Sequence, residues 1–433
     1  MPQQSPIRIT RVHISGFKSY ITRQTIDFSP LTLFFGSNAS GKSSVLQALR
    51  WLGVNARNSR PDVDLVGQAA GLDIGNFRNL VANHDESLLV DIEIEFEQVS
   101  EYRTESFAIR WVIENGSAEG AGRVKELWVT DSSESGFVAR ATRNPQDNIG
   151  THSVEVQADG ALLEKRADLS ISFTGIRLRP FGGNEGIIRE YLSAYSDLLR
   201  FLSRFQFVGP HREQLPRVIL SSSDQNLNNP LGISASGSDD WTRTISKLLR
   251  SNVRLNKVNF YLSELDIPYQ MNFVQVPLEG LPQIALSTLP LIPYFVDRDT
   301  SVKVFAGDIG YGVSQVLPVI IAAVMAEHNF DHTMVEQPEL HLHPRVQARL
   351  ADLLFSPASL GKHVSVETHS EHLIYRVQKL IREKERRPED VSVNYVERTH
   401  GGSVVHKLNI SENGNFIDAW PGGFFDERMD DLL

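Results

Sequence analysis

The sequence predicts an α/β fold with a phosphate-binding loop, and three observations lead to this prediction. Residues 36–43 read G-S-N-A-S-G-K-S, which matches the pattern G-x-x-x-x-G-K-[ST]. This pattern stands between an apolar run at 31–35 and a run with helical spacing at 43–52, which is the context the motif requires. Beyond about residue 300, extended and helical stretches alternate, which indicates a mostly parallel sheet with covering helices.

The composition limits the possible functions. The chain has 433 residues, with 43 basic and 53 acidic side chains and a formal net charge of −10. This charge disfavours binding of nucleic acid by bulk electrostatics, although a local basic groove stays possible. The absence of cysteine excludes disulfides, iron–sulfur clusters and thiol catalysis. No apolar stretch is long enough to span a membrane and no signal peptide is evident, so we expect a cytoplasmic protein.

The N-terminal part combines strand and helix patterns. Two strands are expected at 7–14 and 31–35, followed by the helix at 43–52. From about 88 to 180, apolar and polar residues alternate with a period of two, which predicts antiparallel strands with one exposed, acidic face. We expect an N-terminal ATPase lobe over 1–180 that includes this β subdomain.

The rest of the chain divides into three predicted segments. Apolar stripes with a helical period at 188–202 and 241–249, separated by a polar loop at 221–240, predict a helical lobe over 181–300. A C-terminal ATPase lobe is expected over 301–400, and a short C-terminal domain over 401–433. The lobe at 301–400 should contain strands at 333–336, 363–367 and 391–397 and helices at 313–326, 345–354 and 372–381.

The predicted phosphate site covers residues 36–44. Gly36 and Gly41 let the backbone curl so that its N–H groups face a phosphate, and the following helix adds its positive end. Lys42 would lie along the β- and γ-phosphates, and the Ser43 hydroxyl would bind Mg²⁺, which prefers oxygen ligands. The predicted cofactors are therefore ATP and Mg²⁺. The other loop residues included in the site are Ser37, Asn38, Ala39, Ser40 and Ser44.

Hydrolysis also needs a carboxylate that holds the metal and a group that orients water. Glu336 ends an expected strand, at the edge of the sheet where ligands bind, so we expect it to share the metal with Ser43. His369 follows the next strand, where an imidazole could contact the γ-phosphate or its water. Upstream, the glycines of segment 308–315 precede a helix, and a helix N-terminus suits an anion.

The order of these motifs resembles the ABC-type ATPase heads of the SMC and RecF families, and segment 14–20, which contains Lys18, is also similar to theirs. The chain is closer still to stand-alone prokaryotic ATPases related to the OLD (overcoming lysogenization defect) proteins, with a short C-terminal domain of unknown function. Five strings carry this resemblance: FVGPHR at 207–212, GYGVSQVLP at 310–318, EQPELHLHP at 336–344, ETHS at 367–370 and WPGGFFDE at 420–427. The resemblance implies a P-loop NTPase, specifically an ABC-ATPase head with a mixed sheet, an antiparallel β lobe and an inserted helical lobe.

The resemblance also implies a function. Two heads should pair face to face, with ATP held between the P-loop of one and segment 310–314 of the other. The residues that would contact the nucleotide outside the P-loop are Lys18, Gly310, Tyr311, Gly312 and Ser314. ATP binding would then assemble a homodimer or higher homo-oligomer, and hydrolysis would open it. Many such ATPases are implicated in anti-phage defence, where they control a separate effector such as a toprim-type nuclease.

The sequence departs from the usual head in three places. The signature segment has Gly310 or Tyr311 where a serine is usual, and Ser314 lies one turn later. Gln337 follows the metal carboxylate where a catalytic glutamate is usual, and an amide cannot accept a proton in that role. Glu339 could substitute for it; otherwise hydrolysis should be slow. The third departure is His343 in place of the usual D-loop aspartate.

Other interpretations stay open. One alternative is an ATP-binding scaffold that hydrolyses hardly any ATP. Another is a DNA-binding repair ATPase of the SMC or RecF type, which would need a basic groove. The candidates for such a groove are Lys18, Arg50, Arg57, Arg60 and Arg78. A structural metal on the histidines at 341, 343, 369 and 372 is disfavoured, and we expect no toprim nuclease within this chain. The aromatic residues Trp420, Phe424 and Phe425 could dock onto a partner or pack against the core.

Overall fold

The computed structural model describes most of the chain as two compact units. The P-loop unit lies within residues 4–205, 389–409 and 416–433, and the carboxylate unit lies within residues 206–388 and 410–415. The described residues are 7–57, 65–69, 72–99, 104–116, 120–131, 138–143, 151–158, 161–174, 176–181, 189–212, 214–219, 232–233, 248, 251–275 and 290–421.

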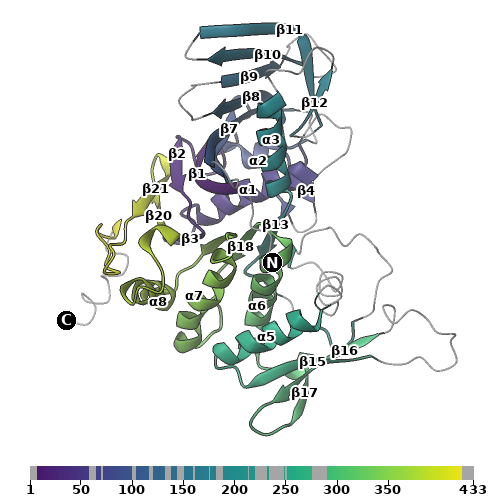
Figure 1. Ribbon diagram of the computed structural model, residues 1–433, viewed down its shortest axis with the longest axis vertical. Helices are drawn as coiled ribbons and strands as arrows, with labels where there is room; N and C mark the ends of the chain where they lie inside the picture. Colours follow the sequence, from purple (N-terminus) through teal and green to yellow (C-terminus); the bar gives the residue numbers. More distant parts are fainter. Residues whose placement is uncertain are drawn as a thin grey trace, which may run out of the picture. The chain divides into compact units, whose positions relative to one another are not determined.

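The P-loop unit contains a nine-stranded antiparallel sheet in the order β12-β11-β10-β9-β8-β7-β6-β1-β2 (Figure 1). In β6 buried and half-buried residues alternate, which is the period-two pattern that its sequence predicts. The strands are β1 (Ile7–Ser15), β2 (Gln24–Asp27), β6 (Val90–Val99), β7 (Thr104–Glu114), β8 (Arg123–Asp131), β9 (Val138–Arg143), β10 (Thr151–Ala158), β11 (Ala161–Thr174) and β12 (Arg177–Phe181).

The P-loop itself follows β3 (Leu31–Phe35), which is buried along its whole length. β20 (Val391–Thr399) pairs with β3 in parallel, from Leu31 opposite Val391 to Phe35 opposite Tyr395. β21 (Gly402–Leu408) then pairs with β20 in an antiparallel register. The C-terminal part of the chain therefore supplies the neighbour of the strand that leads into the P-loop.

Helices α1 (Lys42–Arg57) and α3 (Arg189–Leu202) contact each other within the P-loop unit. Arg57 fixes the end of α1, because its guanidinium donates hydrogen bonds to the backbone oxygens of Ser203 and Phe205. The unit also contains the short elements β4 (Gln68–Ala69), β5 (Leu72–Asp73), α2 (Phe77–Leu80) and η1 (Ala82–His84).

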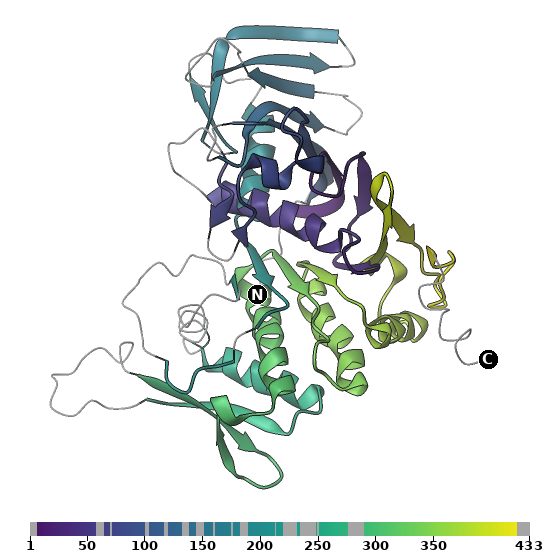
Figure 2. The same cartoon turned by 180° about the vertical axis from the view of Figure 1, so that it is seen from behind.

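The carboxylate unit contains strands in the order β14-β13-β18-β19, with β18 and β19 parallel. Figures 1 and 2 show α6, α7 and α8 as neighbouring helices in this unit. Its main elements are β13 (Phe205–Val208), β14 (Gly232–Ile233), α5 (Asn252–Glu264), α6 (Tyr311–Asn329), β18 (His332–Glu336), α7 (Pro344–Ala358), β19 (His363–Glu367) and α8 (Glu371–Arg382). A separate sheet is formed by β15 (Tyr269–Gln275), β16 (Leu291–Asp297) and β17 (Lys303–Phe305), and the 3-10 turns are η3 (Ala306–Asp308) and η4 (Pro388–Asp390).

The predicted α/β class is confirmed, with a mixed sheet at β3-β20-β21 and an antiparallel β lobe. The strands and helices expected beyond residue 300 are present as β18, β19, β20, α6, α7 and α8. Segment 181–300 holds the helices α3 and α5, but it also holds the strands β13, β14, β15 and β16. The prediction of a helical lobe did not include these strands, because it was based on the apolar stripes of the helices alone. In β16 buried and half-buried residues alternate, which is a strand pattern.

Some predictions fall outside the described residues. These concern the greater part of the loop at 221–240, the stripe at 241–249 apart from Leu248, and the aromatic residues Phe424 and Phe425. The division into the segments 1–180, 181–300, 301–400 and 401–433 stays a prediction. Among the described residues, no helix is both long and apolar enough to cross a membrane.

Candidate functional site

The P-loop connects the buried end of β3 to the first residue of α1. Gly36 and Gly41 have φ angles of 143° and 109°, and Ala39 has a φ of 59°. Positive φ angles of this kind favour glycine and are unusual for alanine. Residues 37–39 are exposed, whereas Gly36 and Ser40 are buried. The exposed tip and the helix start behind it form an anion-binding loop of the kind that the sequence predicts.

Lys42 lies against the inner side of this loop. Its side chain is buried, and its ammonium donates hydrogen bonds to the backbone oxygens of Gly36, at 3.0 Å, and Ser37, at 2.8 Å. The ammonium is therefore held at the loop, where a phosphate could take over part of its coordination. Ser43 and Ser44, in the first turn of α1, are half-buried.

Lys18 lies beside α1. Its φ is 50°, its backbone N–H donates to the Leu80 oxygen at 2.7 Å, and its ammonium donates to the Gln47 side chain in α1. These contacts place Lys18 on the flank of the helix that follows the P-loop. Its predicted contact with nucleotide stays a prediction.

In the carboxylate unit, Glu336 ends β18 with its side chain buried. Its register partner on β19 is Glu367, which is also buried. The chain turns at Gln337, where φ is 46° and the backbone N–H donates to the Glu367 oxygen at 2.7 Å. Both parallel strands therefore end with a carboxylate at the same edge of the sheet, the edge where α/β proteins bind ligands.

The structure brings Glu339 and His369 together. The backbone N–H of His369 donates to Glu339 Oε1 at 2.7 Å. Glu339 is only 8% exposed, and among the described residues its Oε2 has no hydrogen-bond partner. Burial raises the pKa of the Glu339 carboxyl, against the opposing effects of the His369 N–H and the Arg212 guanidinium. A carboxylate with a raised pKa is better suited to accept a proton near neutral pH.

Arg212 holds the turn between these carboxylates. Its side chain is 4% exposed, and its guanidinium donates to the backbone oxygens of Glu336, Gln337 and Gln315. The Gln315 side chain returns a hydrogen bond to the Arg212 oxygen at 2.8 Å. Burial lowers the pKa of Arg212 to about 10, although the nearby carboxylates of Glu339 and Glu336 oppose this shift. Arg212 thus links the start of α6 to the end of β18.

The sequence analysis noted Arg212 only as part of the FVGPHR string and gave it no role. A buried arginine shows no local pattern, because its partners lie on segments that are distant in the sequence. The signal that was available in the sequence is the Gly-Pro-His-Arg string at 209–212, directly after an apolar run.

Three of the strings that carry the family resemblance meet at one cavity of about 320 Å³ within the carboxylate unit. The cavity is lined by Pro210, His211, Arg212, Tyr311, Gln315, Gln337, Leu340 and His341. Gln337, which follows Glu336 directly, therefore lies in the same cavity as Tyr311 and Gln315 of α6.

The signature segment begins helix α6. Gly310 is the N-cap residue, and a Cβ added to it would meet no atom within 4 Å. Tyr311 is 52% exposed, and its ring lies edge-on to His341 with the ring centroids 4.8 Å apart. Gly312 packs closely on the His341 backbone oxygen. Ser314 is buried, and its hydroxyl donates to the Tyr311 oxygen at 2.7 Å. Gly310 and Tyr311 are thus presented at the surface, whereas the Ser314 hydroxyl is directed into its own helix.

His343 caps α7. Its Nδ1 accepts a hydrogen bond from the Arg345 N–H at 3.3 Å, and Pro344 takes the first helical position. This is a helix-capping role of the kind that aspartate often fills. His343 therefore has a local structural function at the start of α7.

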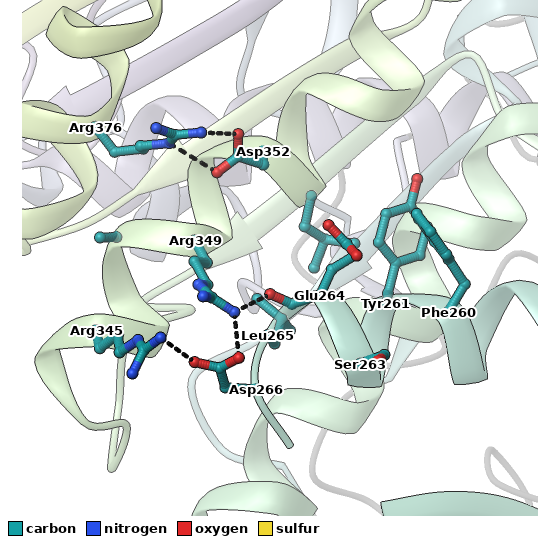
Figure 3. Close-up of a pocket in the computed structure, with 12 residues that line it drawn as sticks. Phe260, Tyr261, Ser263, Glu264, Leu265, Asp266, Arg345, Arg349, Asp352 and Arg376 are labelled. Atoms are coloured by element: carbon teal, nitrogen blue, oxygen red, sulfur yellow. Dashed lines mark hydrogen bonds and ion pairs between the residues drawn. The ribbon is translucent and has the colours of Figure 1, made fainter. Parts of the chain in front are cut away.

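A second cavity, of about 770 Å³, lies between α5, α7 and α8 in the same unit (Figure 3). Its three arginines are each paired with a carboxylate: Arg345 and Arg349 with Asp266, and Arg376 with Asp352. Figure 3 shows these pairs directed toward one another along the wall. Because these cations are compensated by side chains of the wall itself, this cavity is a poor match for an anionic nucleotide.

Comparisons with known proteins agree with this geometry. A family model described as an AAA domain matches residues 11–267, and one described as an AAA ATPase domain matches residues 212–374. A third, for a protein family of unknown function (DUF3696), matches residues 387–433. No curated protein matches the chain.

The solved structures that are similar include three SMC heads. The SMC head domain of Thermotoga maritima is 12% identical, with a TM-score of 0.43, over 93% of this chain and 100% of that one. An SmcHead bound to the C-winged helix domain of ScpA is 15% identical, with a TM-score of 0.47, over 93% of this chain and 98% of that one. An Smc head with an extended coiled coil, bound to the C-terminal domain of ScpA and derived from Pyrococcus furiosus, is 10% identical, with a TM-score of 0.44, over 98% of each chain.

The AAA domain model covers more than half of the 433 residues and includes the P-loop. The AAA ATPase model covers the cavity at Arg212 and the carboxylates that end β18 and β19. The chain therefore belongs to the AAA domain family and is a P-loop ATPase.

Proposed function

We propose that this ATPase is a slow, ATP-gated regulator whose nucleotide-bound dimer controls a separate effector in prokaryotic anti-phage defence. The observation that carries the proposal is Gln337, which stands directly after Glu336 and lines the cavity of the signature segment. Its amide cannot act as a general base. Slow hydrolysis prolongs the ATP-bound state, which suits a switch better than a motor.

In this proposal Lys42 and Ser43 bind the phosphates and Mg²⁺, and Glu336 supplies a carboxylate to the same ion. Hydroxyl and carboxylate oxygens are the donors that Mg²⁺ prefers, so the residues fit the metal. Bound Mg²⁺ would stabilise negative charge on the transferred phosphoryl group. Glu339, with its raised pKa, would accept the proton of the attacking water, and His369 would contact the γ-phosphate.

Dimer formation would use the exposed start of α6. Gly310 and Tyr311 are at the surface, where backbone N–H groups and a phenol could contact a nucleotide bound to another copy. ATP can drive such pairing only if the closed dimer makes contacts that the open state lacks. A γ-phosphate held jointly by two copies would supply this difference.

The test is to measure the mass of the protein in solution with ATP and with ADP. We expect ATP to convert the wild-type monomer into a dimer, and Lys42→Ala to stay monomeric because it loses the buried ammonium at the loop. Lys379→Ala is the matched control, because Lys379 is an exposed lysine on α8. The same variants should be compared in cells challenged with phage, where Lys42→Ala should lose protection and Lys379→Ala should keep it. A dimer of Lys42→Ala with ATP, or full protection by that variant, would refute the proposal.

A DNA-binding repair ATPase of the SMC or RecF type is the alternative function, and it would need a basic groove. Of the residues suggested for a basic groove, Arg57 is bonded to backbone oxygens, and burial lowers its pKa to about 10. Arg60 lies outside the described residues. Strong, salt-sensitive stimulation of ATP turnover by duplex DNA would nevertheless favour this function over a regulatory one.

A further inference from the structure

Segment 387–433 matches a family of unknown function. Within it, the described strands β20 and β21 and Trp420, here called the C-terminal segment, contact the P-loop and the strand that leads into it. β20 pairs with the whole length of β3, and residues of β20 and β21 lie close to the loop. Trp420 packs edge-on against Phe35, the last residue before the loop, with ring centroids 5.4 Å apart. It also packs against Tyr395 and Phe416, so the alternative in which Trp420 packs against the core is confirmed.

The two glycines of the motif are constrained by this segment. A Cβ at Gly36 would overlap the backbone oxygen of Val396 in β20. A Cβ at Gly41 would overlap the hydroxyls of Ser403 in β21 and Ser19. The loop therefore needs glycine at both positions not only for its positive φ angles but also because the C-terminal hairpin approaches so closely.

Two hydroxyl groups hold the backbone oxygens on the rear side of the loop. The Ser403 hydroxyl donates to the Ser40 oxygen, and the Tyr20 phenol donates to the Gly41 oxygen at 3.0 Å. Ser403 is itself fixed, because its N–H donates to the Ser19 oxygen at 2.8 Å and its side chain is 1% exposed. A peptide group is planar, so fixing a carbonyl on one side fixes the direction of the next N–H on the other.

We propose that the C-terminal segment is the rear wall of the phosphate loop, and that Ser403 and Tyr20 are positioning residues for nucleotide phosphates. By holding the Ser40 and Gly41 oxygens, they keep the following N–H groups directed toward the phosphates before ATP arrives. This preorganisation removes an ordering cost from binding. The inference rests on the proposed nucleotide binding at residues 36–44, and it adds Ser403 and Tyr20 to that site as positioning residues.

The experiment compares Ser403→Ala with Ser392→Ala. Ser392 is the matched control, because it is also a buried serine of this segment whose hydroxyl donates to a backbone oxygen, that of Asp27, at 2.7 Å. Affinities for ATP, ADP and inorganic tripolyphosphate are measured by calorimetry, together with kcat, KM and the melting temperature.

We expect Ser403→Ala to weaken binding of all three ligands about 3- to 10-fold, the usual effect of one lost hydrogen bond. KM should rise by the same factor with kcat unchanged, because the lost contact acts equally before and during the reaction. Ser392→Ala should lower the melting temperature to a similar extent and leave the affinities unchanged. Tyr20→Phe, which removes only the phenol oxygen, should reproduce the effect of Ser403→Ala.

Unchanged affinities in both Ser403→Ala and Tyr20→Phe would overturn the rear-wall role while leaving ATP binding intact. Equal weakening by Ser403→Ala and Ser392→Ala would also overturn it, since the effect would then reflect general stability. If wild-type protein binds no more ATP than Lys42→Ala does, the proposed nucleotide binding is wrong. The rear-wall role, which depends on that binding, is then wrong too.

Discussion

At the scale of single residues, Glu339 combines three properties that an alternative base needs. It is buried, one of its oxygens is held by the His369 N–H, and burial raises its pKa. The raised pKa means that the folded protein holds the carboxyl proton more tightly than the unfolded chain does. Ionisation of Glu339 therefore lowers the free energy of unfolding at pH values above its folded pKa.

Glu339→Gln separates catalysis from stability. We expect kcat to fall at least 10-fold at neutral pH because the base is lost, while the free energy of unfolding stays equal or rises because a buried charge is removed. In the wild type, kcat/KM should fall as the pH drops through the raised pKa of Glu339, and this acidic limb should be missing in the variant. Turnover assays over pH and urea unfolding measure both effects.

Gln337→Glu serves as the companion variant, since it restores the usual residue directly after Glu336. It should raise turnover. If Glu339→Gln turned over as fast as the wild type at every pH, Glu339 would not be the base.

The P-loop residues could be predicted from the sequence because their function is local. Glycines and a lysine at fixed spacing suffice to shape the loop. Arg212 and Ser403 could not be predicted in this way, because the Glu336 oxygen and the Ser40 oxygen that they bind lie far away along the chain. Such roles depend on which strands become neighbours, and strand pairing leaves little trace in the local period of a sequence.

At the scale of elements, α5, α6 and α7 are joined by a polar chain. Lys257 of α5 pairs with Glu327 of α6, which also accepts a hydrogen bond from Ser356 of α7 at 3.0 Å. The Tyr261 hydroxyl of α5 donates to Ser356 and completes the chain. Glu327 is almost fully buried, and it is the shared acceptor of Lys257 and Ser356, so its loss would leave both of these donors without this partner.

We expect Glu327→Ala to lower the free energy of unfolding by about 2–3 kcal/mol, because it leaves Lys257 and Ser356 without their shared partner. Glu383→Ala is the control, since Glu383 pairs with Lys379 on the exposed side of α8. The control should change the free energy by less than about 0.5 kcal/mol. Urea unfolding of the two variants provides the comparison. Equal changes in the free energy of unfolding would show that the buried polar side chains around Glu327 stabilise the fold no more than an exposed ion pair does.

The elements beyond residue 300 were predictable for a physical reason. β18 and β19 are short runs that are buried along their whole length, and α8 has an apolar stripe, so the local pattern specifies these elements. β15 and β16 were missed within the segment expected to be helical. The alternation of apolar and polar residues in these two strands is short. It also lies next to residues 276–289, for which the sequence predicts no strand or helix.

At the scale of the whole molecule, the P-loop unit is built from both ends of the chain. β3 lies near the start and β20 near the end, yet they pair in parallel over five residue pairs. Contacts between such distant segments slow folding, because a long loop must close before they form. Residues 389–409 belong to the same compact unit as the P-loop.

Removal of residues 389–433 tests this statement. The truncated chain should lose ATP binding and cooperative unfolding, because β3 would lose its parallel neighbour and expose apolar side chains that are now buried. Calorimetry with ATP and thermal unfolding measure the two effects. A truncated chain that binds ATP with wild-type affinity would contradict the assignment of these residues to the unit.

The parallel pairing of β3 with β20 also has a consequence for synthesis of the protein. A ribosome delivers the glycine loop before the strand that supports it, because β3 precedes β20 in the sequence. Copies released prematurely would carry the motif without a usable binding site, so we expect them neither to consume ATP nor to join complete copies. The truncated chain, mixed with full-length protein, measures this: an unchanged dimer yield is expected, and a reduced yield would show that incomplete copies interfere.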